Sequence, residues 1–350
     1  MTIRSLSRYS ELLGFLSLAV ILLLVFPLAL DSFRLNLVGK YLAFAFVAIG
    51  VVLAWGYGGV LSLGQGLFFG IGGYFMAMFL KLEASSPELP DFMIWSSTEV
   101  LPWWWKPYHS AWFTLLTIVT IPCLVAFPLA YFPFRKRVGG VYFAIVTLSL
   151  ALATTVMLIG QQGYTGGANG ITDFKTFHGW PIRGDQAHLV LYLIEVALLF
   201  IVMAASTFIV RSRLGKVLVA IRDREDRVRF SGYDTALFKA FAFTAGALFA
   251  SLGGAIYSLQ VGLITPTLVG VVASVEMVIY AAVGGRTSVV GAVYGALLVG
   301  FAKSLFSENF ATLWLFFIGG LFIFVVLAMP NGLAGLLDQL SARRSSRSTP

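Results

Sequence analysis

The chain has 350 residues, of which 59% are hydrophobic and only 11% charged, and its formal net charge is +8. This balance excludes a water-soluble domain, whose surface would need many more charged side chains. Apolar runs of about 20 residues, enough helix to span a hydrocarbon core of about 30 Å, recur along the chain and indicate a helical membrane protein rather than a barrel. The positive residues lie in short connections, as in cytoplasmic loops, so we expect membrane lipid and not nucleic acid as a partner.

Hydropathy predicts about ten transmembrane helices in chain order. Their ranges are 12–30, 41–57, 63–81, 111–133, 139–160, 187–210, 240–260, 269–285, 289–306 and 310–329. The first run is longer than the apolar core of a signal peptide and lacks a small-residue cleavage site, so we expect a retained helix. The glycine-rich stretch 56–66 favours a broken or re-entrant segment.

These ranges predict an all-α polytopic membrane protein. We expect a single transmembrane domain over 1–340, followed by a basic tail at 341–350.

The charges of the connections predict the orientation of the chain. Bases follow the fourth, sixth, eighth and tenth predicted spans, at 135–137, 211–239, 286 and 343–347. The connection 83–110 carries four acids and one lysine, and 161–186 is balanced. By the positive-inside rule, both termini and the basic connections lie in the cytoplasm.

The acidic connection 83–110 is rich in tryptophan. Trp103, Trp104, Trp105 and Trp112 are typical of an aromatic belt at the headgroups, although a sugar-stacking platform is an alternative. The three histidines and the single cysteine do not cluster with carboxylates at metal-ligand spacing, so we predict no metal site.

The segment 211–239 reads like part of a soluble protein. It holds eight bases and four acids, 12 of the 40 charged residues of the chain. Apolar residues fall on one face of a predicted helix, and Glu225 interrupts that face. Ion pairs of the i, i+4 type are predicted between Asp223 and Arg227 and between Glu225 and Arg229. Gly232 predicts the end of the helix.

An amphipathic helix between two membrane spans favours docking into a groove of a cytoplasmic partner. The alternative is a helix that lies on anionic headgroups. The intermixed acids favour the partner, because lipid binding alone would select an unbroken basic face.

Several motifs resemble one family of membrane proteins. They are GYGGVLSLGQGLFFGIGGYFMAM at 56–78, YTGGANGITDF at 164–174, the degenerate E-A-A-x-x-x-G loop motif at 226–232, and SVEMVIYAAVGGRTSVVGAVYGALLVG at 274–300. Together they resemble the branched-chain amino acid type of permease in ABC transporters, from about residue 40 to about 335. The stretches LGQG at 63–66 and GITDFK at 170–175 are similar to the urea-transporting subset, whereas Thr287 departs from the usual G-G-R-G.

The resemblance implies a permease subunit of an ATP-driven importer in the bacterial cytoplasmic membrane, for urea or for branched-chain amino acids. It implies a second homologous permease, two ATPase subunits and an extracytoplasmic solute-binding protein as partners. The chain has no G-x-x-x-x-G-K-S/T motif, so we expect ATP to be bound and hydrolysed by the partners and no cofactor to be bound here. The expected ATPase-coupling residues are Arg222, Asp223, Asp226, Arg227 and Gly232.

Polar residues in or near the spans are candidates for the transport path. Glu276 lies inside a predicted span, where a carboxyl either lines a polar path or ties helices together; for Glu195 we favour the tie. Urea would need amide and hydroxyl partners, and Gln65 in the glycine-rich segment offers an amide, although a hydrogen bond between helices explains this residue nearly as well. Asn169 and Thr172 are candidates for the entrance, although for these two residues we favour a plain turn.

Two other classes of function are to be weighed for a helical membrane protein. A self-sufficient secondary transporter or channel would use the intramembrane carboxylates as ion sites. A membrane-embedded enzyme would need a catalytic constellation near a membrane face, and the sequence offers none, so we predict that the chain is not an enzyme.

Overall fold

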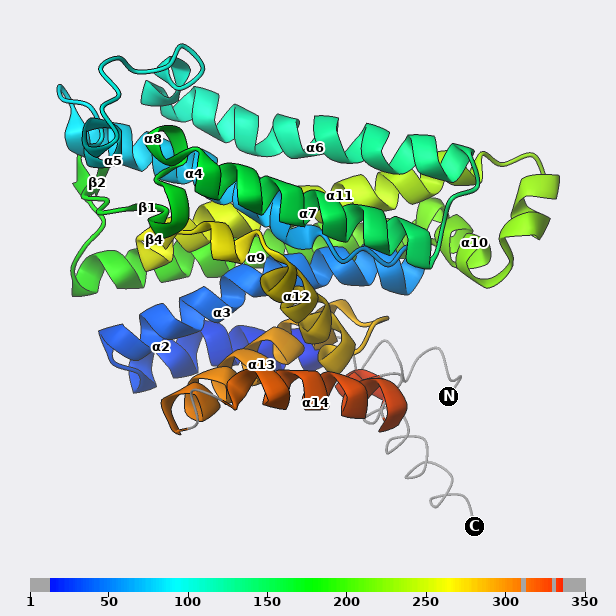
Figure 1. Ribbon diagram of the computed structural model, residues 1–350. Helices are drawn as coiled ribbons and strands as arrows, with labels where there is room; N and C mark the ends of the chain where they lie inside the picture. Colours follow the sequence, from blue (N-terminus) through cyan, green and yellow to red (C-terminus); the bar gives the residue numbers. More distant parts are fainter. Residues whose placement is uncertain (1–12, 310–312, 329–331, 336–350) are drawn as a thin grey trace.

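The computed structural model describes residues 13–309, 313–328 and 332–335. It is built almost entirely of helices, which run roughly side by side (Figure 1). Helices occupy all ten predicted ranges, so the predicted fold class is confirmed. The first is the apolar helix Leu13–Ala29, which includes the π-helical turn η1 (Ile21–Val25) and α2 (Phe26–Ala29).

The other predicted ranges are occupied by nine further helices. They are α3 (Ser32–Val51, continued by the π-helical η2, Val52–Tyr57), α4 (Gln65–Ser85), α6 (Ala111–Arg135), α7 (Val141–Gly160), α9 (Asp185–Arg211), α11 (Thr235–Val261), α12 (Val271–Gly284), α13 (Val289–Asn309) and α14 (Trp314–Ala328). Within the described ranges, seven of the helices are long and apolar enough to cross a membrane. The first helix, α12 and α14 are shorter.

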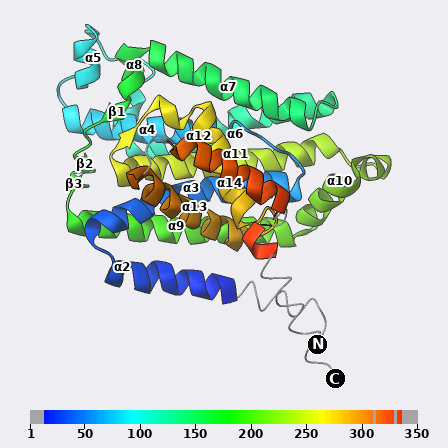
Figure 2. The ribbon, with the colours of Figure 1, turned by 60° about the horizontal axis from the view of Figure 1, so that its bottom comes forward.

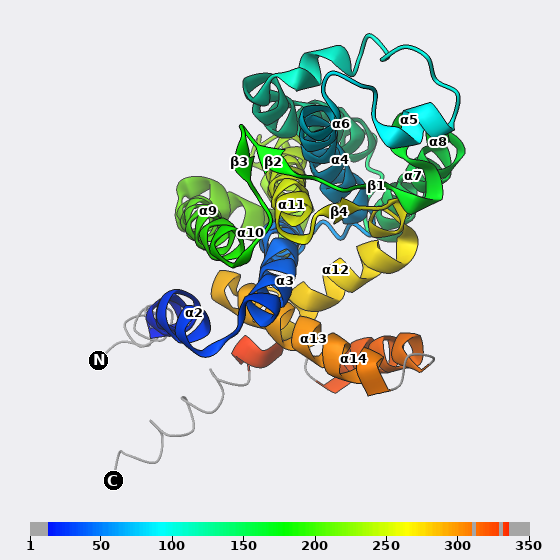
Figure 3. The same ribbon diagram turned by 90° about the vertical axis from the view of Figure 1, so that its left-hand side faces the viewer.

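The centre of the bundle is formed by α3, α4 and α11. In each of these three helices, 72–83% of the most apolar stretch is buried inside the protein, against 28–33% in α6, α7 and α9. Viewed from one end, α11 packs between α3 and α4, while α6, α7 and α9 lie outside (Figure 3). The outer helices therefore face lipid or another subunit, because no water-soluble face would carry so many apolar side chains.

The predicted glycine-rich break is confirmed and lies inside the protein. The helix α3–η2 ends at Tyr57, and α4 begins only at Gln65. Gly58, Val60, Ser62 and Gly64 between them are buried. A non-helical backbone is tolerated at such a place only where protein or water satisfies its polar groups.

The helices α12 and α13 approach each other at backbone distance. A Cβ atom on Gly284 would lie 2.0 Å from the carbonyl oxygen of Gly291, and one on Gly295 would lie 2.2 Å from that of Tyr280. Small residues at such positions are what allows membrane helices to pack closely.

One end of the bundle carries the long connections and the only strands among the described residues. The short helices there are α5 (Asp91–Trp95), η3 (Lys106–His109), α8 (Gln162–Thr165), η4 (Gly167–Asn169) and η5 (Pro266–Leu268). The strands β1 (Ile171–Thr172) and β4 (Leu263–Ile264) are antiparallel, as are β2 (Thr176–Phe177) and β3 (Trp180–Pro181). The Glu83 carboxylate anchors this loop by accepting hydrogen bonds from the amides of His178 and Gly179 at 3.0 and 2.7 Å.

The opposite end carries α10 (Arg213–Phe230), shown at the right of Figure 1 and again from below in Figure 2. The predicted basic connections gather at this end. Lys239 lies over the ring of Phe134 at 5.4 Å, beside 135–137, and Gly56 contacts the carbonyl of Arg286. Three of the four basic segments thus share one side, as the charge pattern predicted; the fourth, 343–347, lies outside the described residues.

Candidate coupling surface and transport path

The segment 211–239 forms the predicted helix with one bend. Only Ser212 separates α9 from α10, and its hydroxyl caps α10 by accepting from the Gly215 amide at 3.5 Å. Arg224 has non-helical torsion angles (φ −152°, ψ 77°), so α10 consists of two pieces. Gly232 follows at φ +87°, a left-handed conformation that ends a helix at little cost only in glycine.

The buried face of α10 matches the predicted apolar stripe in its first half. Leu218 and Ile221 are 0% and 1% exposed, whereas Leu214 and Val228 are half-buried. This face lies against α9 and α11, and so holds α10 to the bundle.

Glu225 interrupts the stripe because it binds the next helix. Its carboxylate accepts from Arg229 at 2.9 Å and from the Thr235 hydroxyl at 3.1 Å, and it forms an ion pair with Lys239. Partial burial alone would raise the pKa of Glu225, but the hydrogen bonds from Lys239 and Thr235 and the nearby positive charges outweigh burial and lower it. The predicted Glu225–Arg229 pair is thereby confirmed.

The predicted Asp223–Arg227 pair is wrong. Asp223 instead pairs with the adjacent Arg222, at 3.0 Å. The bend at Arg224 lies between positions 223 and 227 and removes the helical turn that would bring them together.

Arg222 is exposed, but its guanidinium group reaches the broken helix. Its Nη1 donates to the carbonyl oxygen of Gly56 at 2.5 Å, in the π-helical turn η2. A Cβ on Gly59 would lie 3.1–3.3 Å from Arg222, so the break itself packs against this side chain. The coupling segment is therefore joined to the start of the glycine-rich break.

Other predicted coupling residues face outwards at this end. Asp226, Arg227 and Gly232 are exposed, and so are the neighbouring Phe230 (92%) and Tyr233 (49%). An exposed aromatic pair among charges is typical of a surface that contacts another protein. Phe230 and Tyr233 are absent from the residues predicted from the sequence, although their place inside the charged segment was a usable signal.

Gln65 begins α4 in the interior of the bundle. The residues around it bind neighbouring helices: the Leu63 amide donates to Thr147 of α7 at 3.3 Å, and the Gly66 amide donates to Ser274 of α12 at 3.1 Å. Gln65 itself is 1% exposed, and its side-chain amide has no hydrogen-bond partner among the described residues. Such an amide costs about 1–3 kcal/mol unless water or a solute satisfies it.

Glu276 lies at the centre of a cluster of polar side chains, which we call the intramembrane cluster: Lys40 of α3, Glu276 and Tyr280 of α12, and Lys303 of α13. Lys303 donates to both carboxylate oxygens of Glu276, at 2.7 and 2.8 Å, and the Tyr280 hydroxyl donates to one at 2.6 Å. Lys40 is close enough to interact electrostatically with both Lys303 and Glu276. Next to the cluster, Tyr41 and Ser304 share a hydrogen bond that joins α3 to α13.

Lys40 and Lys303 are absent from the residues predicted from the sequence. Lys303 lies inside the predicted span 289–306, so the cost of charge in a membrane was a signal for it. Lys40 directly precedes the span 41–57 and was indistinguishable from a headgroup anchor.

The remaining candidates lie apart from these sites. Asn169 and Thr172 are exposed in the turn η4 and the strand β1, at the end opposite to α10. Glu195 in α9 is fully buried, and neither of its carboxyl oxygens has a partner within the described ranges, so the structure does not show the expected tie between helices. No group of three or more His, Cys, Asp or Glu side chains that could hold a metal ion is found in the part of the chain that the structure describes.

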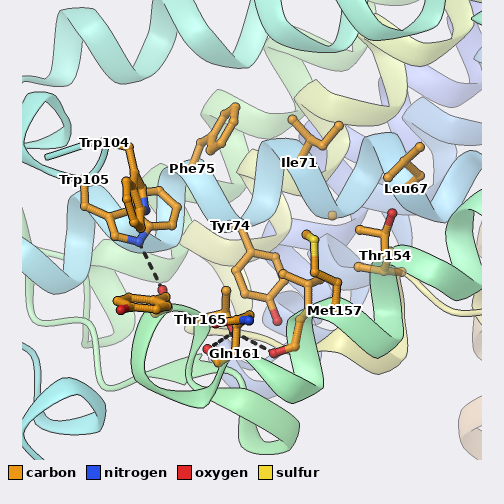
Figure 4. A pocket seen from close by; sticks show the side chains of 14 residues that line it. Leu67, Ile71, Tyr74, Phe75, Trp104, Trp105, Thr154, Met157, Gln161 and Thr165 are labelled. Atoms are coloured by element: carbon orange, nitrogen blue, oxygen red, sulfur yellow. Dashed lines mark hydrogen bonds between the residues drawn. The ribbon is translucent and has the colours of Figure 1, made fainter. Parts of the chain in front are cut away.

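A cavity of about 470 Å³ lies between α4 and α7 near the end with the strands (Figure 4). Its walls are mainly apolar and include Leu67, Ile71, Met157 and Trp104, with Tyr74 pointing in from α4. Trp105 is buried here and donates to the carbonyl of Tyr164 at 3.1 Å, whereas Trp103, Trp104 and Trp112 are exposed, as an aromatic belt requires. These walls suit an acyl chain or a neighbouring helix better than a small polar solute.

The sequence of this chain is similar to those of known permease proteins. Residues 33–326 match the family described as branched-chain amino acid transport system / permease component. The chain is 24% identical over 343 residues to the high-affinity branched-chain amino acid transport system permease protein LivM of Escherichia coli K12, which covers 91% of this chain and 74% of that protein. It is 25% identical over 299 residues to BraD of Pseudomonas aeruginosa, a permease protein of the same description (83% of this chain, 91% of that protein). No solved structure gives a significant match.

Proposed function

Because the chain belongs to the family of branched-chain amino acid transport system permease components, we propose that it is the membrane-spanning permease subunit of an ATP-driven importer. It is a multi-pass membrane protein and a transport subunit, not an enzyme. The observation that carries the proposal is the contact from α10 into the bundle: Arg222 binds the Gly56 carbonyl at the edge of the glycine-rich break.

The proposed coupling runs from α10 to the break. An ATPase that docks on the exposed end of α10, around Asp226, Arg227 and Phe230, would displace the helix on nucleotide binding. Arg222 would pass this displacement to η2 and to residues 58–64, whose non-helical backbone changes shape more easily than a helix. Gly56 also contacts the α12–α13 turn, and the Tyr57 hydroxyl donates to the Thr287 carbonyl at 2.6 Å, so that turn would move as well.

The proposed assembly has four kinds of partner. They are a second, homologous permease, two ATPase subunits that bind and hydrolyse ATP, an extracytoplasmic solute-binding protein, and the lipid of the bacterial cytoplasmic membrane. The end with α10 and both termini would lie in the cytoplasm, as the clustered basic connections favour. In this proposal the chain itself binds no cofactor.

For the substrate we propose urea, on the resemblance of LGQG at 63–66 and GITDFK at 170–175 to urea permeases. The buried, unpartnered amide of Gln65 supports it, because an amide can both donate to and accept from urea. A branched-chain amino acid is the second candidate, since the relatives carry that substrate in their descriptions.

Uptake by the whole complex tests both the importer function and the choice of urea as substrate. The purified complex in liposomes should take up labelled urea only with its ATPase, ATP and binding protein. Uptake by this chain alone, without an ATPase, would overturn the importer in favour of a secondary transporter or channel. Uptake of leucine but not urea would reject urea and leave the importer standing.

A further inference from the structure

The intramembrane cluster of Lys40, Glu276, Tyr280 and Lys303 lies where α3, α12 and α13 meet, and along α3 and α13 it is nearer the end opposite to α10. At about 1.5 Å of rise per residue, Lys40 is about 12 Å from the first residue of α3 and Glu276 about 8 Å from that of α12. Lys303 is about 9 Å from the last residue of α13. The Glu276–Lys303 ion pair and the electrostatic interaction of Lys40 with both residues therefore bring charged groups of three separate helices together inside the apolar bundle.

The cluster holds two ammonium groups against one carboxylate. Lys303 and Glu276 neutralise each other, but Lys40 forms no hydrogen bond or ion pair with any residue that the structure describes. An ammonium group without a counter-charge is costly to place in lipid. Because Lys40 is half-buried and the Lys303 side chain 33% exposed in the isolated chain, this face meets water or another subunit rather than lipid.

A tie between helices does not account for the cluster. Gly284, Gly291 and Gly295 already hold α12 and α13 at backbone distance. A tie needs only the Glu276–Lys303 pair, and such a buried pair adds little stability compared with apolar packing. The third charge, on Lys40, is left without a structural purpose.

The hydrogen-bonding capacity of the cluster indicates what it could hold. The Lys40 ammonium offers three N–H donors. The Glu276 carboxylate has about four acceptor positions, and Lys303 and Tyr280 use three of them. The open groups are therefore N–H donors beside one carboxylate acceptor.

We propose that the intramembrane cluster is a solute-binding site on the transport path. It takes a small solute that presents a carbon-bound oxygen close to an N–H group: the oxygen accepts from Lys40 and the N–H donates to Glu276. Urea and an α-amino acid both carry this pair of groups, as a carbonyl with amide N–H or as a carboxylate with an ammonium group. The site rests on the proposed function as an import permease.

Thiol labelling tests whether the cluster is open to water and to solute. In the complete complex, with the single cysteine removed by Cys123→Ala, Lys40→Cys should react with a charged, membrane-impermeant thiosulfonate reagent added from the outside. The transported solute, urea or leucine, should slow this reaction at least 5-fold. The solute that protects Lys40→Cys is then the substrate that binds at the cluster. Val47→Cys, at a fully buried position of the same helix, is the matched control and should not react. No reaction at Lys40→Cys, or reaction that neither solute slows, would overturn the site.

Uptake by two further variants separates binding from structure. Lys40→Gln should lower the maximal uptake rate at least 10-fold, whereas Arg34→Gln, at an exposed base of the same helix, should not. The double variant Glu276→Lys with Lys303→Glu keeps the ion pair between α12 and α13, so the complex should still assemble. It moves the carboxylate to the other helix, so uptake should be lost. Full uptake by this double variant would show that the cluster only holds the helices together and does not bind solute. If the wild-type complex imports neither solute, the proposed function fails; if it imports one and Lys40→Gln imports it equally well, only the site fails.

Discussion

Two glutamates in this protein each lie near two bases, and the difference between them is instructive. Glu225 at the surface of α10 binds Arg229, four residues on, and Lys239, 14 residues on. Glu276 inside the bundle binds Lys303, 27 residues on, with Lys40 of a third helix nearby. The Glu225 side chain is 31% exposed and that of Glu276 only 9%. Water therefore reaches the Glu225 carboxylate and screens its pairs, whereas the Glu276 carboxylate is shielded from water and depends mainly on its protein partners.

The largest expected effect is the removal of the buried carboxylate. Glu276→Leu removes the carboxylate that Lys303 binds and that attracts Lys40, so we expect a loss of about 3–5 kcal/mol of stability. Glu225→Leu should cost only about 1 kcal/mol, because the Glu225 carboxylate is itself 31% exposed and its pairs are already screened by water. Thermal unfolding of the two variants in detergent measures the difference. Equal losses would show that burial does not distinguish the two sites.

A close backbone contact next to the coupling segment should be the next most sensitive point. In Gly56→Ala the new Cβ would lie 1.6 Å from the Arg286 carbonyl oxygen, so η2 and the α12–α13 turn must separate. We expect a loss of about 1–3 kcal/mol. Gly160→Ala is the matched control, since nothing lies within 4 Å of its added Cβ. Thermal unfolding compares them; an unchanged Gly56→Ala variant would mean that this contact is loose.

Arg222 and Arg227 should separate force transmission from docking. Arg222→Met removes the hydrogen bond to the Gly56 carbonyl, and we expect uptake to fall about 10-fold while the ATPase still binds, a loss near 1.4 kcal/mol. Arg227→Met, at an exposed position, should instead weaken co-purification of the ATPase. If both variants lose the ATPase equally, Arg222 belongs to the docking surface and not to the linkage.

The smallest effect is that of pH on the Glu225 contacts. Its folded pKa lies below the ordinary value of 4.5, so these contacts are fully present above pH 4.5 and are lost as the pH falls through the lower, folded value. The protection of residues 225–239 against hydrogen exchange, corrected for the intrinsic exchange rate, should therefore be constant between pH 6 and 8. It should decrease only below pH 4.5. Glu225→Gln should show the loss at pH 7. Decreasing protection near pH 6 would contradict the lowered pKa.

Much of the fold follows from patterns that are local in the sequence. The length of the apolar runs predicts the ten helices, and the basic connections predict which of them share an end of the bundle. The glycines at 56–66 predict the break, and the spacing of Glu225 and Arg229 predicts their ion pair. The bend at Arg224 was not predicted, because no proline or glycine marks it.

The candidate site was only partly predictable, for a reason that Lys40 makes plain. It lies 236 positions before Glu276, and nothing in its own surroundings distinguishes it from a lysine at the headgroups. Arg222 likewise reads as one more surface base until the Gly56 carbonyl is found beside it.

The sequence by itself determined that the chain is a membrane protein, roughly where its ten apolar helices lie, and which connections carry positive charge. These properties depend on transfer into lipid and on periodicity, which neighbouring residues decide together. Only the tertiary structure decided that Arg222 reaches the broken helix and that Lys40, Glu276 and Lys303 meet. Such contacts join helices far apart in the chain, and their partners are set by packing rather than by spacing.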